Sequence, residues 1–389
     1  MKRKIIVPVA VSVIVCMLIA AISISYRSAY INTKVDDLID LGIPYQYQYG
    51  RVDPEETSLI PWDMKMYDEK LYVSAGDGTL NTGPVELNWY DTNAGEWTFN
   101  GYTVLEETIF SFTEMDGVLT IAGSDASADG WEFGNYYQLR NGVWEQYSVL
   151  PDARHCFDLC RFGNRIFAAT GTTPGLSPLL VSNDNGKTFE HIPLVEKGLA
   201  METSAYTYVR GHLLFEQEDT LYALIRLTKE NATDSLIARY EPENDWFTVI
   251  GNYNNIFRQV PNVSLRRIHF VESSAIWRGV NYFANGRLVR FENNALEICP
   301  VLKDVVIWDL LVYEDCLYLL GSNDAENPKR VEVYKTDNGV DFERVLWFVS
   351  DMSAVSFEMD ETYFYFGMAN PAEPDIEDTG KILAVDYTD

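Results

Sequence analysis

A unit of two short strands joined by a tight turn recurs along most of this chain, and it limits the fold more than any other feature. The two clearest copies read PWDMKMYDEKLYVSAG from Pro61 and IWDLLVYEDCLYLLGS from Ile307. They match at a Trp-Asp pair, a Tyr, a Leu-Tyr pair and the small residues that follow. Such repetition indicates an array of equivalent structural units rather than an irregular domain.

The repeat continues through residues 60–389. Residues that begin the second strand of a unit recur at intervals of 41 to 55 positions, at Leu71, Leu119, Ile166, Leu221, Ile276, Leu317 and Tyr363. A polar turn and a large apolar residue follow the first six of them, at Trp97, Trp144, Phe189, Trp246, Leu296 and Phe342. Turns rich in Asn and Gly supply the positive φ angles that tight hairpins need. The pattern predicts an all-β fold, a seven-bladed β-propeller.

The seventh unit is short, because only the strand Ile382–Tyr387 follows Phe364. Tyr45–Arg51 alternates aromatic and polar residues, as a half-buried strand does. We therefore predict a propeller domain over residues 44–389 in which residues 44–52 close the last blade and remove its exposed edge. Residues 28–43 are predicted to be a polar linker with a short helix near Asp36–Asp40.

Residues 1–27 form a separate segment. Lys2, Arg3 and Lys4 precede the uncharged stretch Ile5–Ile24, which is long enough to cross a bilayer as a helix. The basic residues favour a cytoplasmic N-terminus. A cleaved signal peptide is the alternative, with small residues at its end that suit cleavage. The protein is therefore expected to be either a single-pass membrane protein with its propeller outside the cytoplasm or a secreted one.

The charge of the chain restricts its partners. The formal net charge is −28, and the first 27 residues hold four basic residues and no acid, so the remainder carries −32. Such a domain repels nucleic acids and anionic membrane surfaces. We expect no nucleic-acid partner, contact with the membrane only through the N-terminal helix, and a protein or glycan partner at the cell surface.

One turn resembles a known sequence motif. Residues 182–189 read SNDNGKTF and resemble the Asp-box, or bacterial neuraminidase repeat (S/T-x-D-x-G-x-T-W/F), at Ser182, Asp184, Gly186, Thr188 and Phe189. A degenerate copy over residues 335–342 keeps Asp337, Gly339 and Phe342. The resemblance is to the sialidase-like, Asp-box β-propellers as a fold. It implies that the box is a folding element remote from the active site.

The same resemblance gives little support to sialidase chemistry. Sialidases use three arginines, a Tyr nucleophile with a Glu partner and an Asp acid/base, and they carry an Arg-Ile-Pro motif that this sequence lacks. Arginines do occur in or near predicted inner strands, at Arg154, Arg210, Arg266 and Arg267, but no pattern groups three of them. We therefore expect a non-catalytic module that binds a protein or glycan. The alternative is a glycan-active enzyme, a glycoside hydrolase or lyase.

Three acids occupy one equivalent position of the predicted inner strands. Asp63, Asp158 and Asp309 align with one another, and the other units have Ser111, Leu213, Ile268 and Val355 there. Inner strands line the central channel of a propeller, so the three carboxylates could converge and bind a cation or a sugar hydroxyl. Alternatively, each of them accepts backbone N–H groups of the adjacent blade.

Long polar loops are expected to form a recognition face. Trp131 and Phe133 either anchor a protein or a sugar ring there, or pack onto their blade. Asp125–Gly130 resembles the start of a calcium loop, but Tyr136 stands where Glu is needed, so the segment is either a polar hairpin loop or a calcium-binding loop. Four histidines in different repeats lack zinc-ligand spacing, so we expect no zinc and no cofactor other than calcium. Cys299 and Cys316 are either paired or two free thiols.

Overall fold

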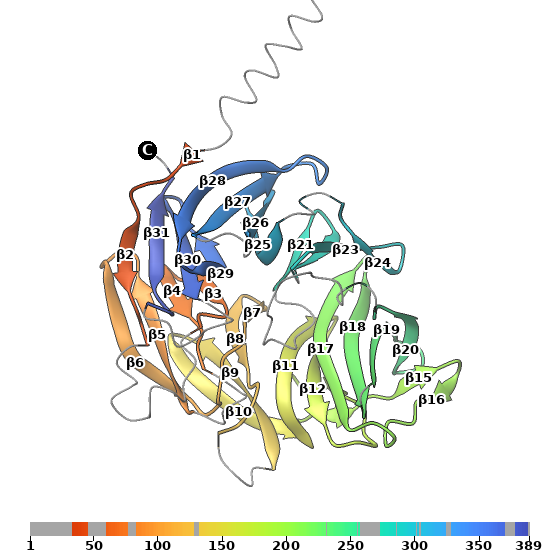
Figure 1. Ribbon diagram of the computed structural model, residues 1–389. Helices are drawn as coiled ribbons and strands as arrows, with labels where there is room; N and C mark the ends of the chain where they lie inside the picture. Colours follow the sequence, from red (N-terminus) through yellow and green to blue (C-terminus); the bar gives the residue numbers. More distant parts are fainter. Residues whose placement is uncertain are drawn as a thin grey trace, which may run out of the picture.

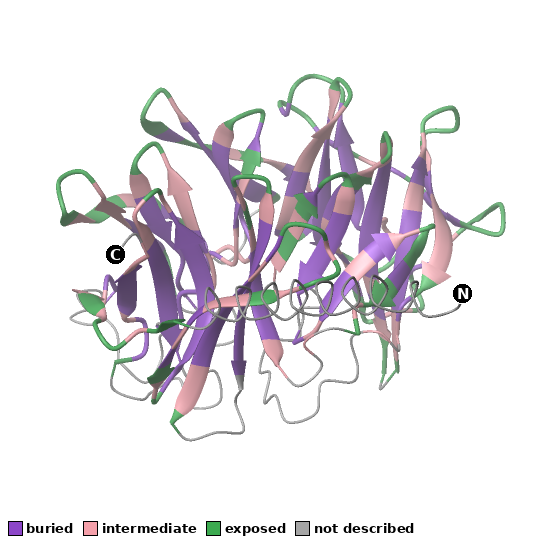
Figure 2. Cartoon of the chain, turned by 90° about the horizontal axis from the view of Figure 1, so that it is seen from above, coloured by how far each residue is buried: buried purple, intermediate pink, exposed green. Residues whose placement is uncertain are grey.

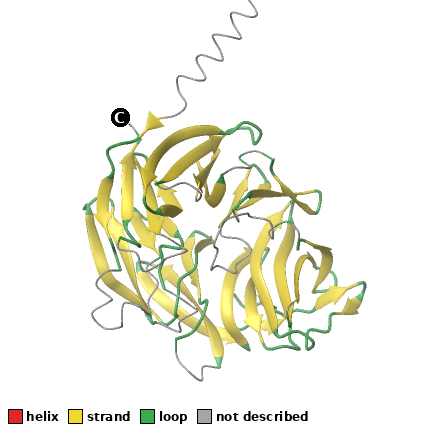
Figure 3. Cartoon of the chain, in the orientation of Figure 1, coloured by secondary structure: helices red, strands yellow, loops and turns green. Residues whose placement is uncertain are grey.

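The computed structural model describes residues 33–45, 60–76, 83–127, 132–230, 232–254, 256, 273–284, 286–300, 302, 305–323, 328–369 and 378–387. These ranges contain strands and loops and no helix, as Figure 3 shows. The sheets stand around a common centre (Figure 1), which makes the fold an all-β β-propeller. The predicted fold class is confirmed to that extent.

The sheets are built from neighbouring strands in chain order. The first contains β3 (Met64–Tyr67), β4 (Lys70–Val73), β5 (Val85–Asp91) and β6 (Glu96–Val104). The second contains β7 (Phe112–Met115), β8 (Val118–Ala122), β9 (Phe133–Arg140) and β10 (Val143–Pro151). In both, antiparallel pairing runs outward from the first strand, which stands next to the centre (Figure 1).

A ten-stranded sheet follows, made of two antiparallel runs of four strands and one added hairpin. The first run is β11 (Ala153–Phe162), β12 (Arg165–Thr172), β13 (Leu179–Ser182) and β14 (Glu190–His191). The second is β17 (Tyr208–Gln217), β18 (Thr220–Lys229), β19 (Ala232–Glu241) and β20 (Trp246–Asn252). The runs join where β12 pairs with β17, and the hairpin β15 (Leu194–Glu196) and β16 (Leu199–Ala200) extends the outer edge.

Three further sheets complete the ring. One is β21 (Ser273–Trp277), β22 (Val280–Ala284), β23 (Leu288–Glu292) and β24 (Ala295–Ile298). The next is β25 (Val306–Tyr313), β26 (Cys316–Asn323), β27 (Lys329–Thr336) and β28 (Glu343–Ser350), with β1 (Thr33–Lys34) added in parallel. The last is β29 (Ser353–Met359), β30 (Tyr363–Ala369), β31 (Ile382–Asp386) and β2 (Ile39–Gly42).

The N-terminal segment supplies the outermost strand of the last sheet, but with residues other than those predicted. Ile39–Gly42 pairs antiparallel with β31. The predicted linker and short helix are therefore wrong for residues 33–34 and 39–42. Ile39 and Leu41 alternate with Asp40 and Gly42, a period of two that suits a strand, and Leu41 packs on the core. Of the predicted strand 44–52, only residues 44 and 45 lie within the described ranges.

Apolar residues fill the space between neighbouring sheets. Tyr72 of the first sheet packs on Phe112 and Trp144 of the second, with ring centroids 6.3 and 6.0 Å apart. Figure 2 shows the strands buried along most of their length and the exposed residues gathered at the turns. The core is therefore a series of interfaces between sheets. No helix within the described ranges is long and apolar enough to cross a membrane, and the predicted span Ile5–Ile24 lies outside them.

Six of the seven predicted second-strand residues lie in second strands, and Ile276 does not. Ile276 belongs to β21, the first strand of its sheet, and is 56% exposed. The equivalent of Leu71 is Asn281, which pairs with Ile276 as Leu71 pairs with Met66. The prediction failed because a buried Asn occupies an otherwise apolar position. Its amide donates to the Glu216 carbonyl at 2.7 Å, so the polar group is satisfied.

The turn after β13 is held by its own side chains. Asp184 accepts hydrogen bonds from the backbone N–H groups of Lys187 and Thr188 and from the Thr188 hydroxyl, at 3.1, 2.9 and 2.7 Å. The two Thr188 bonds, above all the one from its hydroxyl, lower the pKa of Asp184 to about 2. Ser182 Oγ accepts from the N–H of Gly186 at 2.8 Å. Phe189 packs edge-on against Tyr136 of the preceding sheet.

The second copy of this turn uses different residues from those predicted. Thr336 Oγ1 accepts from the N–H of Gly339 at 2.9 Å, and Asn338 Oδ1 accepts from the N–H of Asp341 at 2.8 Å. Asn338 therefore takes the role expected of Asp337. The reason is that one residue fewer separates the hydroxyl from the glycine than in the first copy. Phe342 packs against the neighbouring core, as its counterpart Phe189 does.

We expect Gly186→Ala to lower the free energy of unfolding by about 3 kcal/mol, because it adds both strain and a clash. The residue has a φ of +82°, and an added Cβ would lie 2.5 Å from Tyr136 Oη. Gly142→Ala is the matched control, with a φ of +76° and nothing within 4 Å of the added Cβ. It should cost about 1 kcal/mol. Equal losses in urea unfolding of the two variants would show that the Tyr136 contact does not restrict this turn.

Candidate functional site

A cavity of about 600 Å³ occupies the centre of the ring, lined by residues of the first strand of each sheet run. Its charged lining is mostly acidic. The acids are Asp63, Glu114, Asp116, Asp158, Glu216, Asp309 and Glu358, and the bases in the described lining are Lys65 and Arg161. Such a cavity favours cationic or neutral, hydroxyl-rich groups over anions. It is the candidate site that the fold itself provides.

The three predicted acids Asp63, Asp158 and Asp309 all line this cavity, and each accepts a backbone N–H from the next sheet or run. Asp63 Oδ2 accepts from Phe112 at 2.7 Å, Asp158 Oδ2 from Leu214 at 2.7 Å, and Asp309 Oδ2 from Phe357 at 2.9 Å. Their common bond therefore fastens neighbouring sheets together. The geometry explains their repetition without a ligand.

Two residues of the same series escaped the sequence alignment. By strand register Ser273 is the counterpart of Asp63, because it pairs with Ala284 of β22, three residues beyond Asn281. Its Oγ accepts the N–H of Leu310 in the next sheet at 3.1 Å. Ser356 donates its hydroxyl to the carbonyl of Pro61 at 2.6 Å and so joins the last sheet to the first.

The misalignment arises in the second strands, because Ile276 lies five residues before Asn281 and Tyr363 lies one residue before Phe364, which pairs with Met359 as Leu71 pairs with Met66. A β-bulge also recurs in the first strands. The register of the first strand shifts immediately before Asp158, Leu213, Asp309 and Ser356, so one extra residue is inserted there. The sequence alignment placed Val355 at this position, but Val355 is the inserted residue. A bulge bends the strand and re-aims its side chains. Phe157 and His212 are inserted residues of this kind, and both line the cavity.

Burial shifts three acids of the cavity lining toward their protonated form. It raises the pKa of Asp63 to about 8, with the nearby charge of Asp309 as the second cause. It raises the pKa of Asp158 and of Glu358 to about 7. Lys65 lies between two acids, 3.3 Å from Glu114 and 3.7 Å from Glu358. The lining thus contains the Lys65 ammonium group, which lies between two acids, and carboxyl groups that gain or lose a proton near neutral pH.

The remaining predicted site residues are not gathered at the cavity. Phe133 begins β9 and is 39% exposed, whereas Trp131, Arg266 and Arg267 lie outside the described ranges. Asp125 lies beside His155, Arg154 and Arg210. The four cysteines of the described ranges are free thiols. Those ranges hold no group of three or more His, Cys, Asp or Glu residues placed to bind a metal ion.

Comparisons with known proteins assign this chain to no family. No family model matches this chain, and no curated protein does. Catalytically inactive virginiamycin B lyase from Staphylococcus aureus with quinupristin is similar at 13% identity and a TM-score of 0.47, over 90% of this chain and 98% of that one. YCF48 from Cyanidioschyzon merolae is similar at 10% and 0.48, over 90% and 99%. The β-propeller domain of the Trilobed protease from Pyrococcus furiosus is similar at 9% and 0.46, over 84% and 94%.

Proposed function

We propose that this protein is an extracytoplasmic, membrane-tethered β-propeller that binds a protein or a glycan without catalysing a reaction. In this proposal the two runs of the ten-stranded sheet count as separate blades, which gives seven, and the turns after β13 and β27 are Asp-boxes of the sialidase-like type. The stretch Ile5–Ile24 is the tether, or a signal peptide if it is cleaved.

One observation carries the non-catalytic reading. The acids that recur around the channel are engaged in backbone hydrogen bonds between sheets, and Glu114 and Glu358 are both close to Lys65. These groups stabilise the contacts between sheets, and the acidic cavity between them is left for a ligand. A partner's basic side chain or a hydroxyl-rich sugar suits this lining better than an anion does.

We expect Ser274→Trp to abolish ligand binding, because Ser274 is an exposed residue that lines the cavity and the indole would fill it. The full-length chain, purified in a mild detergent, is tested on a glycan array and by crosslinking capture from outer-surface extracts. Val340→Trp is the control, since Val340 is 70% exposed in the turn after β27. A ligand retained equally by both variants and the unmodified protein would show that the channel does not bind it.

The second candidate is a glycan-active enzyme, which the carboxyls of Asp158 and Glu358 favour. Burial gives both a pKa of about 7 within the same cavity, a value suited to proton transfer at neutral pH. Turnover of a panel of fluorogenic glycosides and unsaturating glycan substrates by the unmodified chain would support this candidate. Turnover that persists in Glu358→Gln and in Asp158→Asn would place the chemistry elsewhere.

A further inference from the structure

A second group of charged side chains gathers beside the channel, around Phe157. Arg154 and His155 come from the start of β11, Arg210 comes from the start of β17, and Asp125 follows β8. Asp125 Oδ2 lies 3.5 Å from His155 Nδ1, and both arginines are close enough to lower the pKa of Asp125. Two guanidinium groups thus gather near Asp125 in a chain of net charge −28.

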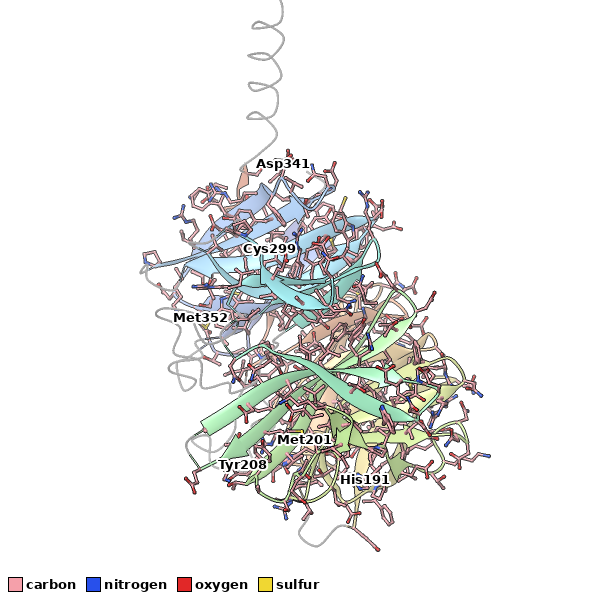
Figure 4. All side chains as sticks on the ribbon, turned by 90° about the vertical axis from the view of Figure 1, so that its right-hand side faces the viewer. His191, Met201, Tyr208, Cys299, Asp341 and Met352 are labelled. Atoms are coloured by element: carbon pink, nitrogen blue, oxygen red, sulfur yellow. The ribbon has the colours of Figure 1, made fainter. Side chains whose placement is uncertain are left out.

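The Arg210 guanidinium group is held by packing, whereas Arg154 is exposed, and both keep their donors available. The Arg210 guanidinium carbon lies 5.7 Å from the ring centroid of Phe157 and 5.2 Å from that of Tyr208. Within the described ranges, the guanidinium groups of Arg154 and Arg210 form no hydrogen bond and no ion pair. Tyr208 is 54% exposed and, as Figure 4 shows, lies toward the same side of the ring as Met352. Stacking fixes the plane of a guanidinium while its N–H groups remain free for an oxyanion.

A glycine makes room for the His155 ring between the two strands that carry the arginines. Gly171 of β12 pairs with His155 on one side and Arg210 on the other. A Cβ at Gly171 would approach His155 Cδ2 to 2.8 Å. His155 itself is neutral, because burial and then Arg210 lower its pKa to about 4, and its Nδ1 is 2.6 Å from the Ser124 carbonyl. The ring therefore adds no competing charge.

Asp125 is the internal counter-charge of the two arginines. The groups facing it are His155 and Arg154 from β11, Arg210 from β17, and Glu106 from the segment before β7. Burial raises the pKa of Asp125 to about 6 even though both arginines oppose the shift. A second anion beside Asp125 would repel its carboxylate and favour its protonation.

We propose that Arg154 and Arg210 form a binding site for a small oxyanion, a carboxylate or a sulfate group, in which Asp125 is the resident counter-charge that the incoming anion replaces. Guanidinium groups bind planar or tetrahedral oxyanions through paired N–H donors. Because the anion and the ionised Asp125 compete for the same arginines, anion binding takes up a proton. Affinity therefore rises as the pH falls. The proposal does not depend on the proposed function, since it requires no ligand in the channel.

The test uses trifluoroacetate as the probe and ligand-observed fluorine NMR on the full-length chain in detergent. Trifluoroethanol, a neutral molecule of similar size, is the matched control probe. We expect trifluoroacetate to bind, more tightly at pH 5.5 than at pH 7.5, on either side of the Asp125 pKa of about 6. Competition by acetate and by methyl sulfate then shows whether the site prefers a carboxylate or a sulfate group. Binding of both fluorinated probes, or of neither, would overturn the proposal.

Three variants separate this site from non-specific attraction. Arg154→Gln and Arg210→Gln should each weaken trifluoroacetate binding by about tenfold, since each removes one charged donor group. Asp125→Asn should bind the probe more tightly at pH 7.5 and weaken the pH dependence, while Glu106, with a pKa of about 7, still titrates in this range. Arg290→Gln is the control, because Arg290 is a half-buried residue paired with Glu292 and Glu297. Thermal unfolding confirms that each variant is folded. An unchanged pH dependence in Asp125→Asn would refute the role of Asp125.

Discussion

Deleting residues 33–45 from the full-length chain should lower the free energy of unfolding by roughly 5 kcal/mol, given the apolar area and hydrogen bonds that are lost. This segment ties the last sheet to the first. β2 pairs with β31, while Trp97 donates to the Leu41 carbonyl at 2.6 Å and Asn88 donates to that of Pro44 at 2.8 Å. Tyr45 is 2% exposed, and its hydroxyl bonds to the carbonyl of Val73.

Smaller changes in the same segment give a graded series. Tyr45→Phe removes one hydrogen bond and should cost about 1 kcal/mol, whereas Tyr45→Ala also leaves a cavity and should cost about 4 kcal/mol. Asp37→Ala is the control, because Asp37 is exposed. Chemical unfolding monitored by tryptophan fluorescence measures the four variants and the parent chain. A deletion as stable as the parent chain would mean that the ring holds without this segment.

Raising the pH from 5 to 9 should destabilise the protein by on the order of 3 kcal/mol, because several buried carboxyls must ionise in the folded state. Burial raises the pKa of Asp63 to about 8 and that of Asp158, Glu358 and Glu106 to about 7. A raised folded-state pKa means that the native protein binds more protons than the unfolded chain. The corresponding stability is complete below pH 4 and is lost as the pH rises through 7 to 8.

Asp63 provides the sharpest version of this measurement. Asp63→Asn keeps an oxygen to accept the N–H of Phe112 but cannot ionise, so its stability should depend less on pH. Asp63→Ala leaves that N–H without its acceptor and should cost about 2 kcal/mol at pH 5. Asp219→Asn is the control, an exposed turn residue with a φ of +57° that Asn also adopts. A pH profile unchanged in Asp63→Asn would contradict the raised pKa.

Local sequence patterns predicted the fold well. They could not predict the contacts between residues that are distant in the sequence. The matching copies around Asp63 and Asp309 revealed the repeat and the shared place of both acids. Asn281 broke the apolar pattern, and the use of Tyr363 in place of its neighbour Phe364 shifted the alignment of the last unit by one residue. Ser273 and Ser356 were consequently missed, although they make the same kind of contact between sheets.

The cluster beside Phe157 lay beyond any sequence pattern. Asp125, Arg154 and Arg210 come from different sheet runs, and only the curvature of the ring brings them together. The glycine between them gave no local signal, because Gly171 has ordinary strand geometry. Sequence spacing therefore predicts which residues repeat. The ligands that these residues can bind depend on how neighbouring sheets pack together.

The added strand β1 determines where a preceding segment would be attached to the propeller. Thr33 and Lys34 pair with Leu346 and Trp347 of β28, the outermost strand of the sheet built from β25 onward, so the described chain begins at the circumference (Figure 1). Any preceding tether would therefore pull on the rim and not along the axis. Attachment at the rim would leave the central cavity clear of the tether. A partner large enough to cover that cavity need not compete with the tether.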